Sequence, residues 1–249
     1  MPGQSQSQGE GGMLATSPDP YRYDGQTLDP YEASGLVASL VSEGARLLDV
    51  GCGTGGLAEL LRDARRARVV GVEPDPLRAA RARERGIEVH DGLLSPSLAA
   101  TLGTFDVVLY ADVLEHLVDP LGELKKVAQL LAPDGVMIIS VPNVAHWSVR
   151  VNLLRGRFNY APTGIMDATH LRWFTSRTLL QLLKRAGFAP VHVKHSAGFS
   201  LPCYQNKMLS RIPTRLRHAA IRRLIKFAPT LFACQFVMVL EQQDLTPSR

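Results

Sequence analysis

The chain has 249 residues, of which 45% are hydrophobic and 20% charged, with a formal net charge of +5. This composition is ordinary for a globular protein, and the three cysteines have neither the pairing of a disulfide framework nor the spacing of a zinc site. No apolar run reaches the roughly 18 to 20 residues that a membrane-spanning helix needs.

The chain begins with the polar stretch MPGQSQSQGEGG, so we expect residues 1–20 to be a disordered tail. This stretch lacks the basic and apolar regions of a signal peptide, which favours a cytoplasmic protein. We expect a single domain over residues 21–241 and a short tail over 242–249.

Apolar runs alternate with amphipathic helical patterns along the chain. The predicted strands are ARLLDV at 45–50, RVVGVE at 68–73, GIEVH at 86–90, FDVVLY at 105–110, VMIISVP at 136–142, FAPVHVKH at 188–195 and LFACQFVMVLE at 231–241. The predicted helices cover 55–66, 75–86, 119–131 and 175–187. This alternation predicts an α/β fold with a doubly wound, seven-stranded and mostly parallel sheet.

Two segments interrupt the alternation. One is the loop-rich connection at 143–173, and the other is a helical segment at 204–229. In the second, apolar residues recur every three or four positions, at Leu209, Ile212, Leu216, Ala220, Leu224 and Phe227. This pattern predicts a basic amphipathic helical insert. Its apolar side either packs against the sheet edge or a second subunit, as in a homo-oligomer, or meets one of the anionic partners considered next.

The insert belongs to a basic region. Residues 168–240 contain twelve Lys and Arg residues but no Asp or Glu, which indicates an anionic partner or a solvated basic surface. The partners we consider are an anionic membrane surface, a phosphorylated or nucleotide-linked acceptor, and, last, nucleic acid.

The stretch LLDVGCGTGG at 47–56 joins the first strand to the first helix. Gly51, Gly53 and Gly55 would let a ligand lie against bare backbone beside a helix N-terminus. Glu73 ends the second strand, where a carboxylate can accept hydrogen bonds from ribose hydroxyls. Together these features predict a cofactor that contains adenosine.

The same stretch also matches the dinucleotide pattern G-x-G-x-x-G, so the glycines alone do not identify the cofactor. Asp49 would lie near the middle of the ligand, where a dinucleotide places its pyrophosphate and a carboxylate would repel it. S-adenosylmethionine instead places its ammonium and sulfonium groups there. Asp49 therefore favours S-adenosylmethionine, and an NAD-dependent oxidoreductase is a less favoured alternative.

Several ordered motifs resemble those of class I S-adenosylmethionine-dependent methyltransferases, namely LLDVGCGTG, GVEPD, HDGLL, FDVVLYADVLEHLVDP and LLAPDGVMIISVPN. The blocks SVPNVAHWSVRVNLLRGRFNY and THLRWFTSRTLLQLLKRAGF resemble the MetW-like and ubiquinone-O-methyltransferase-like branch. The resemblance implies methyl transfer to a small, sugar-linked or lipid-linked acceptor. The MetW-like likeness also allows a non-catalytic, cofactor-binding partner of another enzyme.

The resemblance also implies roles for individual residues. The residues expected to bind the cofactor are Tyr23, Asp49, Gly51, Cys52, Gly53, Gly55, Glu73, Pro74, Asp91, Gly92, Leu93, Tyr110, Ala111 and Asp112. Tyr21 and Tyr23 are expected to close over the cofactor from the N-terminal arm.

A hydroxyl acceptor needs a general base, because its oxygen attacks well only as it loses its proton. The candidates are His116, His146 and His170, and we favour His116 and His170 as catalytic residues, with no metal. The first follows the fourth strand, and the second lies in the 143–173 connection expected to cover the acceptor. The aromatic residues expected on the acceptor side are Trp147, Phe158, Tyr160, Trp173 and Phe174.

Overall fold

The structure is a computed structural model that describes residues 24–205 and 209–243. The strands are β1 (Arg46–Val50), β2 (Arg68–Glu73), β3 (Glu88–Asp91), β4 (Phe105–Ala111), β5 (Leu131–Pro142), β6 (Phe188–His195) and β7 (Gln235–Gln242). The α-helices are α1 (Ala33–Ala38), α2 (Gly56–Arg65), α3 (Pro76–Glu84), α4 (Pro96–Leu102), α5 (Pro120–Val127), α6 (Trp147–Leu154), α7 (Ser176–Ala186), α8 (Thr214–Phe227) and α9 (Pro229–Phe232). Short 3-10 turns cover η1 (Leu114–His116), η2 (Pro202–Tyr204) and η3 (Leu209–Arg211). The predicted tail at 1–20 lies outside the described residues.

The seven strands form one sheet in the order β3-β2-β1-β4-β5-β7-β6. The first five strands in this order are parallel to one another, and β7 is antiparallel to both β5 and β6. The predicted doubly wound, mostly parallel sheet is therefore confirmed. The strand order reverses between β1 and β4, and this is the place where such sheets bind ligands, beyond the carboxyl ends of the strands.

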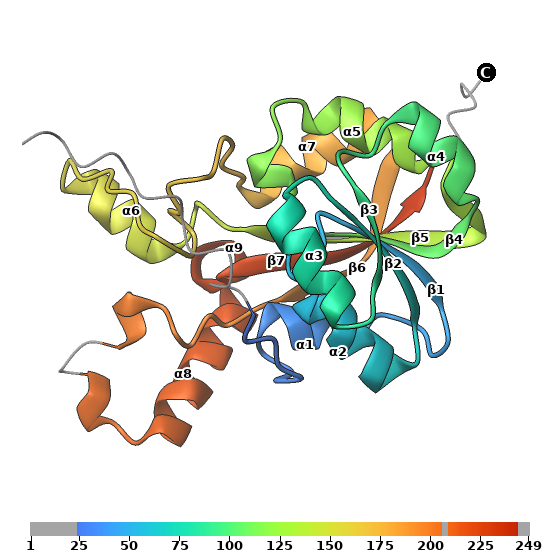
Figure 1. The fold of residues 1–249 in the computed structure, drawn as a ribbon. Helices are drawn as coiled ribbons and strands as arrows, with labels where there is room; N and C mark the ends of the chain where they lie inside the picture. Colours follow the sequence, from blue (N-terminus) through green and yellow to red (C-terminus); the bar gives the residue numbers. More distant parts are fainter. Residues whose placement is uncertain (1–23, 206–208, 244–249) are drawn as a thin grey trace, which may run out of the picture.

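Helices cover both faces of the sheet, with α4, α5 and α7 on one side and α1 and α2 on the other (Figure 1). Successive strand residues point to opposite faces. Leu47 packs with α1 and α2, whereas Leu48 belongs to the larger core that includes Leu124 of α5 and Leu183 of α7. The central strands are thus buried on both faces, as their unbroken apolar runs predict.

Local capping sets the predicted helix ends. The Asp75 carboxylate accepts hydrogen bonds from the backbone N–H groups of Leu77 and Arg78 at the start of α3. Thr175 caps α7 in the same way, and Gly187 ends it in the left-handed conformation at φ 87°. Both ends follow from residue types visible in the sequence.

The structure departs from the predicted elements at several points. Helices α1, α4 and α6 were not predicted, and α6 occupies part of the 143–173 connection. The last strand begins at Gln235, because Pro229 starts the short helix α9 over part of the apolar run assigned to that strand. In the part of the chain that the structure describes, no helix is long and apolar enough to cross a bilayer.

Candidate functional site

A cavity of about 810 Å³ opens beyond the carboxyl ends of β1, β2 and β4. The turns after these strands line it, together with part of the segment between α6 and α7. The predicted site residues that line it are Asp49, Gly51, Cys52, Gly53, Glu73, Pro74, Gly92, Leu93, Ala111, Asp112, His116 and His170.

The glycine turn is fixed to the neighbouring strand. The backbone N–H groups of Gly51 and Cys52 both donate to the carbonyl oxygen of Val72, at 2.7 and 3.2 Å. Gly53 and Gly55 have left-handed backbones, with φ of 57° and 79°. A Cβ on Gly53 would meet no atom within 4 Å, whereas one on Gly55 would lie 2.9 Å from the Cβ of Ala82 in α3.

These surroundings predict different effects for two alanine substitutions. Gly55→Ala should lower the free energy of unfolding by at least about 2 kcal/mol, because left-handed strain adds to a clash with the α3 helix. Gly53→Ala should lower the free energy of unfolding by only about 1 kcal/mol, from left-handed backbone strain alone. It should impair cofactor binding, because its methyl group would enter the cavity. Urea unfolding and cofactor titration would separate the two effects. Gly44→Ala, at φ 72° and with nothing within 4 Å, controls for strain alone.

Asp49 lies at the base of the glycine turn and is only 2% exposed. Burial, with a smaller contribution from the charge of Glu73, raises the pKa of Asp49 to about 7. A bound cation beside Asp49 would oppose both effects and favour the ionised carboxylate. A positively charged group bound here would therefore face an ionised Asp49.

The pKa of Asp49 predicts how the ligand-free protein responds to pH. Between the ordinary pKa of 3.8 and about 7, the folded state keeps a proton on Asp49 that the unfolded state has released. The free energy of unfolding should therefore fall as pH rises through this window, by on the order of 4 kcal/mol from this group. Urea unfolding at a series of pH values would measure the slope, and Asp49→Asn should make it shallower. An unchanged slope in that variant would contradict the assignment.

The Glu73 carboxylate stabilises the same region of the cavity. One of its oxygens accepts a hydrogen bond from the backbone N–H of Gly53 at 2.8 Å, and the other accepts from the N–H of Asp75 at 2.9 Å. Each carboxylate oxygen can accept more than one hydrogen bond. Glu73 can thus hold the glycine turn and still accept from a ribose diol.

The N-terminal segment also reaches this turn. The Asp24 carboxylate accepts a hydrogen bond from the Thr54 hydroxyl and forms a 3.0 Å ion pair with Arg85, the residue that follows α3. Gln26 and Ser34, which sequence reasoning missed, line the cavity nearby. Tyr23, predicted to close over the cofactor, lies outside the described residues.

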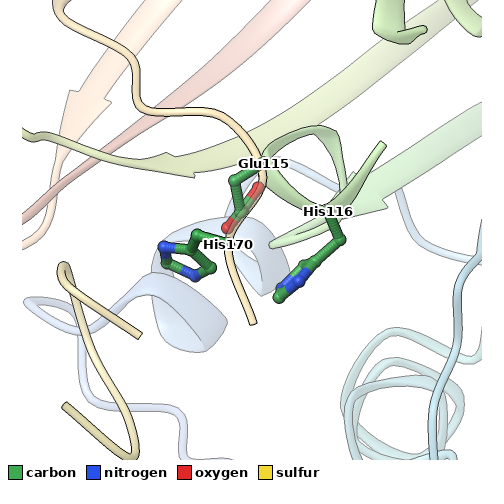
Figure 2. A group of neighbouring side chains, drawn as sticks. All are labelled: Glu115, His116 and His170. Atoms are coloured by element: carbon green, nitrogen blue, oxygen red, sulfur yellow. The ribbon is translucent and has the colours of Figure 1, made fainter. Parts of the chain in front are cut away.

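His116 and His170 are 54 positions apart in sequence but meet at the cavity (Figure 2). Their ring centroids are 4.9 Å apart, and the planes are inclined by 75°. The Nδ1 atom of His116 lies 3.2 Å from the carbonyl oxygen of Thr169. A carbonyl oxygen only accepts, so the tautomer that makes this contact a hydrogen bond has its proton on Nδ1 and its lone pair on Nε2.

Glu115 is a lining residue that sequence reasoning missed, although it stands beside His116 in the quoted motif. Its side chain is 1% exposed, and neither carboxylate oxygen has a hydrogen-bond partner in the described part of the chain. Burial and the neighbouring acids Asp112 and Asp167 hold its pKa well above the usual range. Ligand atoms of Glu115, His116 and His170 all lie within 4.8 Å of one another (Figure 2), so these side chains could together hold a divalent cation.

Three residues expected to bind the cofactor do not line the cavity. The Tyr110 side chain belongs to the larger core, because its position on β4 points it toward α5. Asp91 forms a 2.7 Å ion pair with Arg83. Gly55 serves as the N-cap of α2 and packs against Ala82.

The third candidate histidine and the aromatic residues lie elsewhere. His146 is buried and bonded to Ser148 and Tyr204, and burial lowers its pKa to about 4. Phe158, Tyr160 and Trp173 form a cluster with ring centroids 5.6 to 6.2 Å apart, and none of them lines the cavity. Trp147 donates a hydrogen bond to Tyr204, and Phe174 lies in the core.

Three features indicate the class of protein: the strand order, the glycine turn, and the acids at the ends of β1 and β2. They are typical of doubly wound proteins that bind a cofactor containing a nucleoside. Residues 26–193 match the family described as "Methyltransferase domain". The chain belongs to this family, and its fold and motifs place it among the class I S-adenosylmethionine-dependent methyltransferases.

Individual relatives agree with this assignment. The chain is 34% identical over 166 residues to "Ubiquinone biosynthesis O-methyltransferase" of Cereibacter sphaeroides. This alignment covers 64% of the chain and 66% of the relative, so the chain spans just under two thirds of the relative's length. It is 29% identical to a probable S-adenosylmethionine-dependent methyltransferase of Mycolicibacterium smegmatis, covering 82% and 76%. A crystal structure from Thermotoga maritima, a possible histamine N-methyltransferase, shares the fold with a TM-score of 0.55 at 19% identity, covering 85% and 87%.

Proposed function

We propose that this protein transfers a methyl group from S-adenosylmethionine to a hydroxyl oxygen of a small, sugar-linked or lipid-linked metabolite. The observation that supports the proposal is that one cavity contains two features. The first is the buried carboxyl group of Asp49 beside the glycine turn, and the second is the pair His116 and His170, whose rings are in contact. The first suits a cationic aminoacyl-sulfonium ligand, and the second suits a hydroxyl acceptor.

The residues of the cavity fit the cofactor. Asp49 would accept from the ammonium group of its methionine part, and the backbone of Gly53, where a Cβ would meet no atom within 4 Å, leaves room for close approach. Glu73 would accept from the ribose hydroxyls, and Leu93, 69% exposed, would cover the adenine. Carboxylates outnumber cationic side chains in the lining, which disfavours the diphosphate of NAD.

The cofactor supplies a methyl group on a positively charged sulfur, so the chain's own task is to align the acceptor and remove its proton. We assign the proton removal to Nε2 of His116, in the tautomer whose Nδ1–H donates to the Thr169 carbonyl. His170 and Thr169 would orient the ring. The cavity volume of about 810 Å³ lies in the upper part of the range for ligand pockets, which leaves room for an acceptor head group beside the cofactor.

The choice of oxygen as the attacking atom rests on two supports. One is the pair of histidines at the cavity. The other is the name of the Cereibacter sphaeroides relative, an O-methyltransferase that is 34% identical over the aligned region. Amine acceptors would not require a general base of this kind when they react as the free base.

A methyl-transfer assay tests the proposal. S-adenosylmethionine with a labelled methyl group would be incubated with the full chain and a panel of phenols, sugars and their lipid-linked forms. We expect label in at least one hydroxyl compound and the formation of S-adenosylhomocysteine. If the cofactor binds, no acceptor is methylated and the chain copurifies with a stoichiometric partner, the alternative of a non-catalytic partner protein replaces this proposal.

A further inference from the structure

Helix α8 packs on the body of the protein through one face only. Ile221 and Ile225 are buried in the larger core. The ring of His218 stacks on Phe199 with centroids 3.7 Å apart, and the guanidinium of Arg222 lies 4.7 Å from the ring centroid of Tyr31. These contacts fix which side of α8 faces away from the protein. The helix itself lies at the edge of the molecule, away from α5 and α7 (Figure 1).

The outward face of α8 carries apolar side chains. Leu216 is 63% exposed and Phe227 88% exposed, and Leu224 is 42% exposed. Leu216, Ala220 and Phe227 follow spacings of four and seven, so they lie along one ridge of the helix, directly opposite Ile221 and Ile225. Of the alternatives given for the insert, packing against the body of the protein is made by the two isoleucines, and the apolar stripe read from the sequence stays exposed on α8.

Cationic side chains lie within and beside this ridge. Arg223 stands within it, and Arg215 and Lys226 lie along one side, all three exposed. Neither α8 nor the sequence on either side of it, within residues 168–240, contains an Asp or Glu. A helix that turns both apolar and cationic side chains away from its own core is typical of a segment that lies in the interface of an anionic membrane.

We propose that the outward face of α8, formed by Leu216, Ala220, Arg223, Leu224 and Phe227 with Arg215 and Lys226, docks on an anionic lipid bilayer. The apolar ridge would enter the boundary between head groups and acyl chains, while the cations contact lipid phosphates. Because α8 has only 14 residues, it would lie on the surface of the bilayer.

Other partners fit this face less well. A second copy of the chain would bring the same cations against each other with no acid from α8 to pair them. Nucleic acid would be attracted by the cations but would gain little from Leu216 and Phe227, whose apolar surface has no counterpart on a phosphate backbone. An anionic bilayer matches both the charge and the apolar ridge.

The inference does not depend on the proposed methyl transfer, although a surface-bound enzyme would be well placed to meet a lipid-linked acceptor. Its test therefore measures binding and not activity. The full chain would be sedimented with vesicles of phosphatidylcholine alone and with vesicles that also contain phosphatidylglycerol. We expect binding to the second kind, weakened by added salt.

Two variants of α8 separate the contributions. Leu216→Ser with Phe227→Ser should weaken binding on the order of 100-fold, about tenfold for each apolar side chain that no longer leaves water. Arg215→Gln, Arg223→Gln and Lys226→Gln together should weaken it about fivefold per charge, roughly 100-fold in all. All five positions are exposed, so thermal unfolding should be unchanged.

Matched controls come from other surfaces. Arg177→Gln, Lys184→Gln and Arg185→Gln remove three exposed charges from α7, and Leu77→Ser removes an exposed apolar side chain from α3. These variants should bind vesicles like the wild type. Equal binding to both kinds of vesicle, binding to neither, equal losses in the control variants, or a dimer that Phe227→Ser dissociates would each overturn the proposal.

Discussion

Replacing Asp49 with Asn is expected to weaken binding of S-adenosylmethionine on the order of 100-fold. The substitution keeps the size of the side chain but removes the negative charge that would face the ammonium group of the ligand. Loss of one partner of a buried charge pair costs roughly 2 to 5 kcal/mol, which corresponds to a factor of about 30 or more. Calorimetric titration with S-adenosylmethionine and S-adenosylhomocysteine measures the effect.

The affinity of the wild type should also depend on pH in a defined way. Because burial raises the pKa of Asp49 to about 7, the ligand must displace a proton at lower pH, and binding should weaken up to about tenfold for each pH unit below 7. Above about pH 8 the α-amino group of the ligand loses its charge, so binding should weaken again. The Asp49→Asn variant should lose the acidic limb of this profile.

Asp91→Asn is a matched control for this experiment. The sequence assigns both acids to the cofactor site, but the structure pairs Asp91 with Arg83 outside the cavity lining. Its substitution should change the affinity less than about twofold. Equal effects of the Asp49 and Asp91 substitutions would show that the cavity has been assigned wrongly.

Replacing His116 with Ala should lower kcat for a hydroxyl acceptor by a factor of about 10² to 10⁴, the usual contribution of a general base. The affinity for S-adenosylhomocysteine should stay close to that of the wild type, because Asp49 and Glu73 are unchanged. His170→Ala should have a smaller effect on kcat, since we assign it the orientation of the His116 ring. Single-turnover methyl transfer over a range of pH measures both variants.

The control for the histidines is His192→Ala, an exposed position on β6, which should leave kcat unchanged. A chelator provides a second contrast. Loss of wild-type activity on treatment with EDTA would mean that Glu115, His116 and His170 act by holding a cation, and the base assignment would then be wrong.

Most of the fold could be predicted because its signals are local. The apolar runs of the central strands and the caps at Asp75 and Thr175 each depend on a few adjacent residues. The helices that were missed are short, although Ser95 caps α4 and His146 caps α6. Helix α1 has six residues and no side-chain cap, and α4 has seven, so neither carries enough turns to show a clear periodicity.

The cofactor side of the site was also predictable in part, because a glycine turn between a strand and a helix has a characteristic sequence. Side-chain direction on β4 was harder to predict. Tyr110 and Ala111 are adjacent, yet only Ala111 faces the cavity, and a shift of one position changes the face. Glu115 could have been found beside His116, but its burial depends on the distant segment around Leu171, whose backbone N–H donates to the Glu115 carbonyl.

The face of α8 shows a different limit of sequence reasoning. Its apolar residues fall into two sets, and periodicity alone does not say which set packs against the protein. Stacking of His218 on Phe199 and placement of Arg222 over Tyr31 decide the orientation, and both partners come from elsewhere in the chain. The sequence therefore left open whether the set from Leu216 to Phe227 packs against the protein or faces a partner.

A structure of the complex with S-adenosylhomocysteine tests the central claim most directly, because it locates each part of the ligand. We predict the amino group of the ligand beside Asp49, its ribose hydroxyls at Glu73, and the open side of its sulfur toward His116 and His170. A ligand bound away from the glycine turn, or a sulfur that faces away from both histidines, would contradict the account.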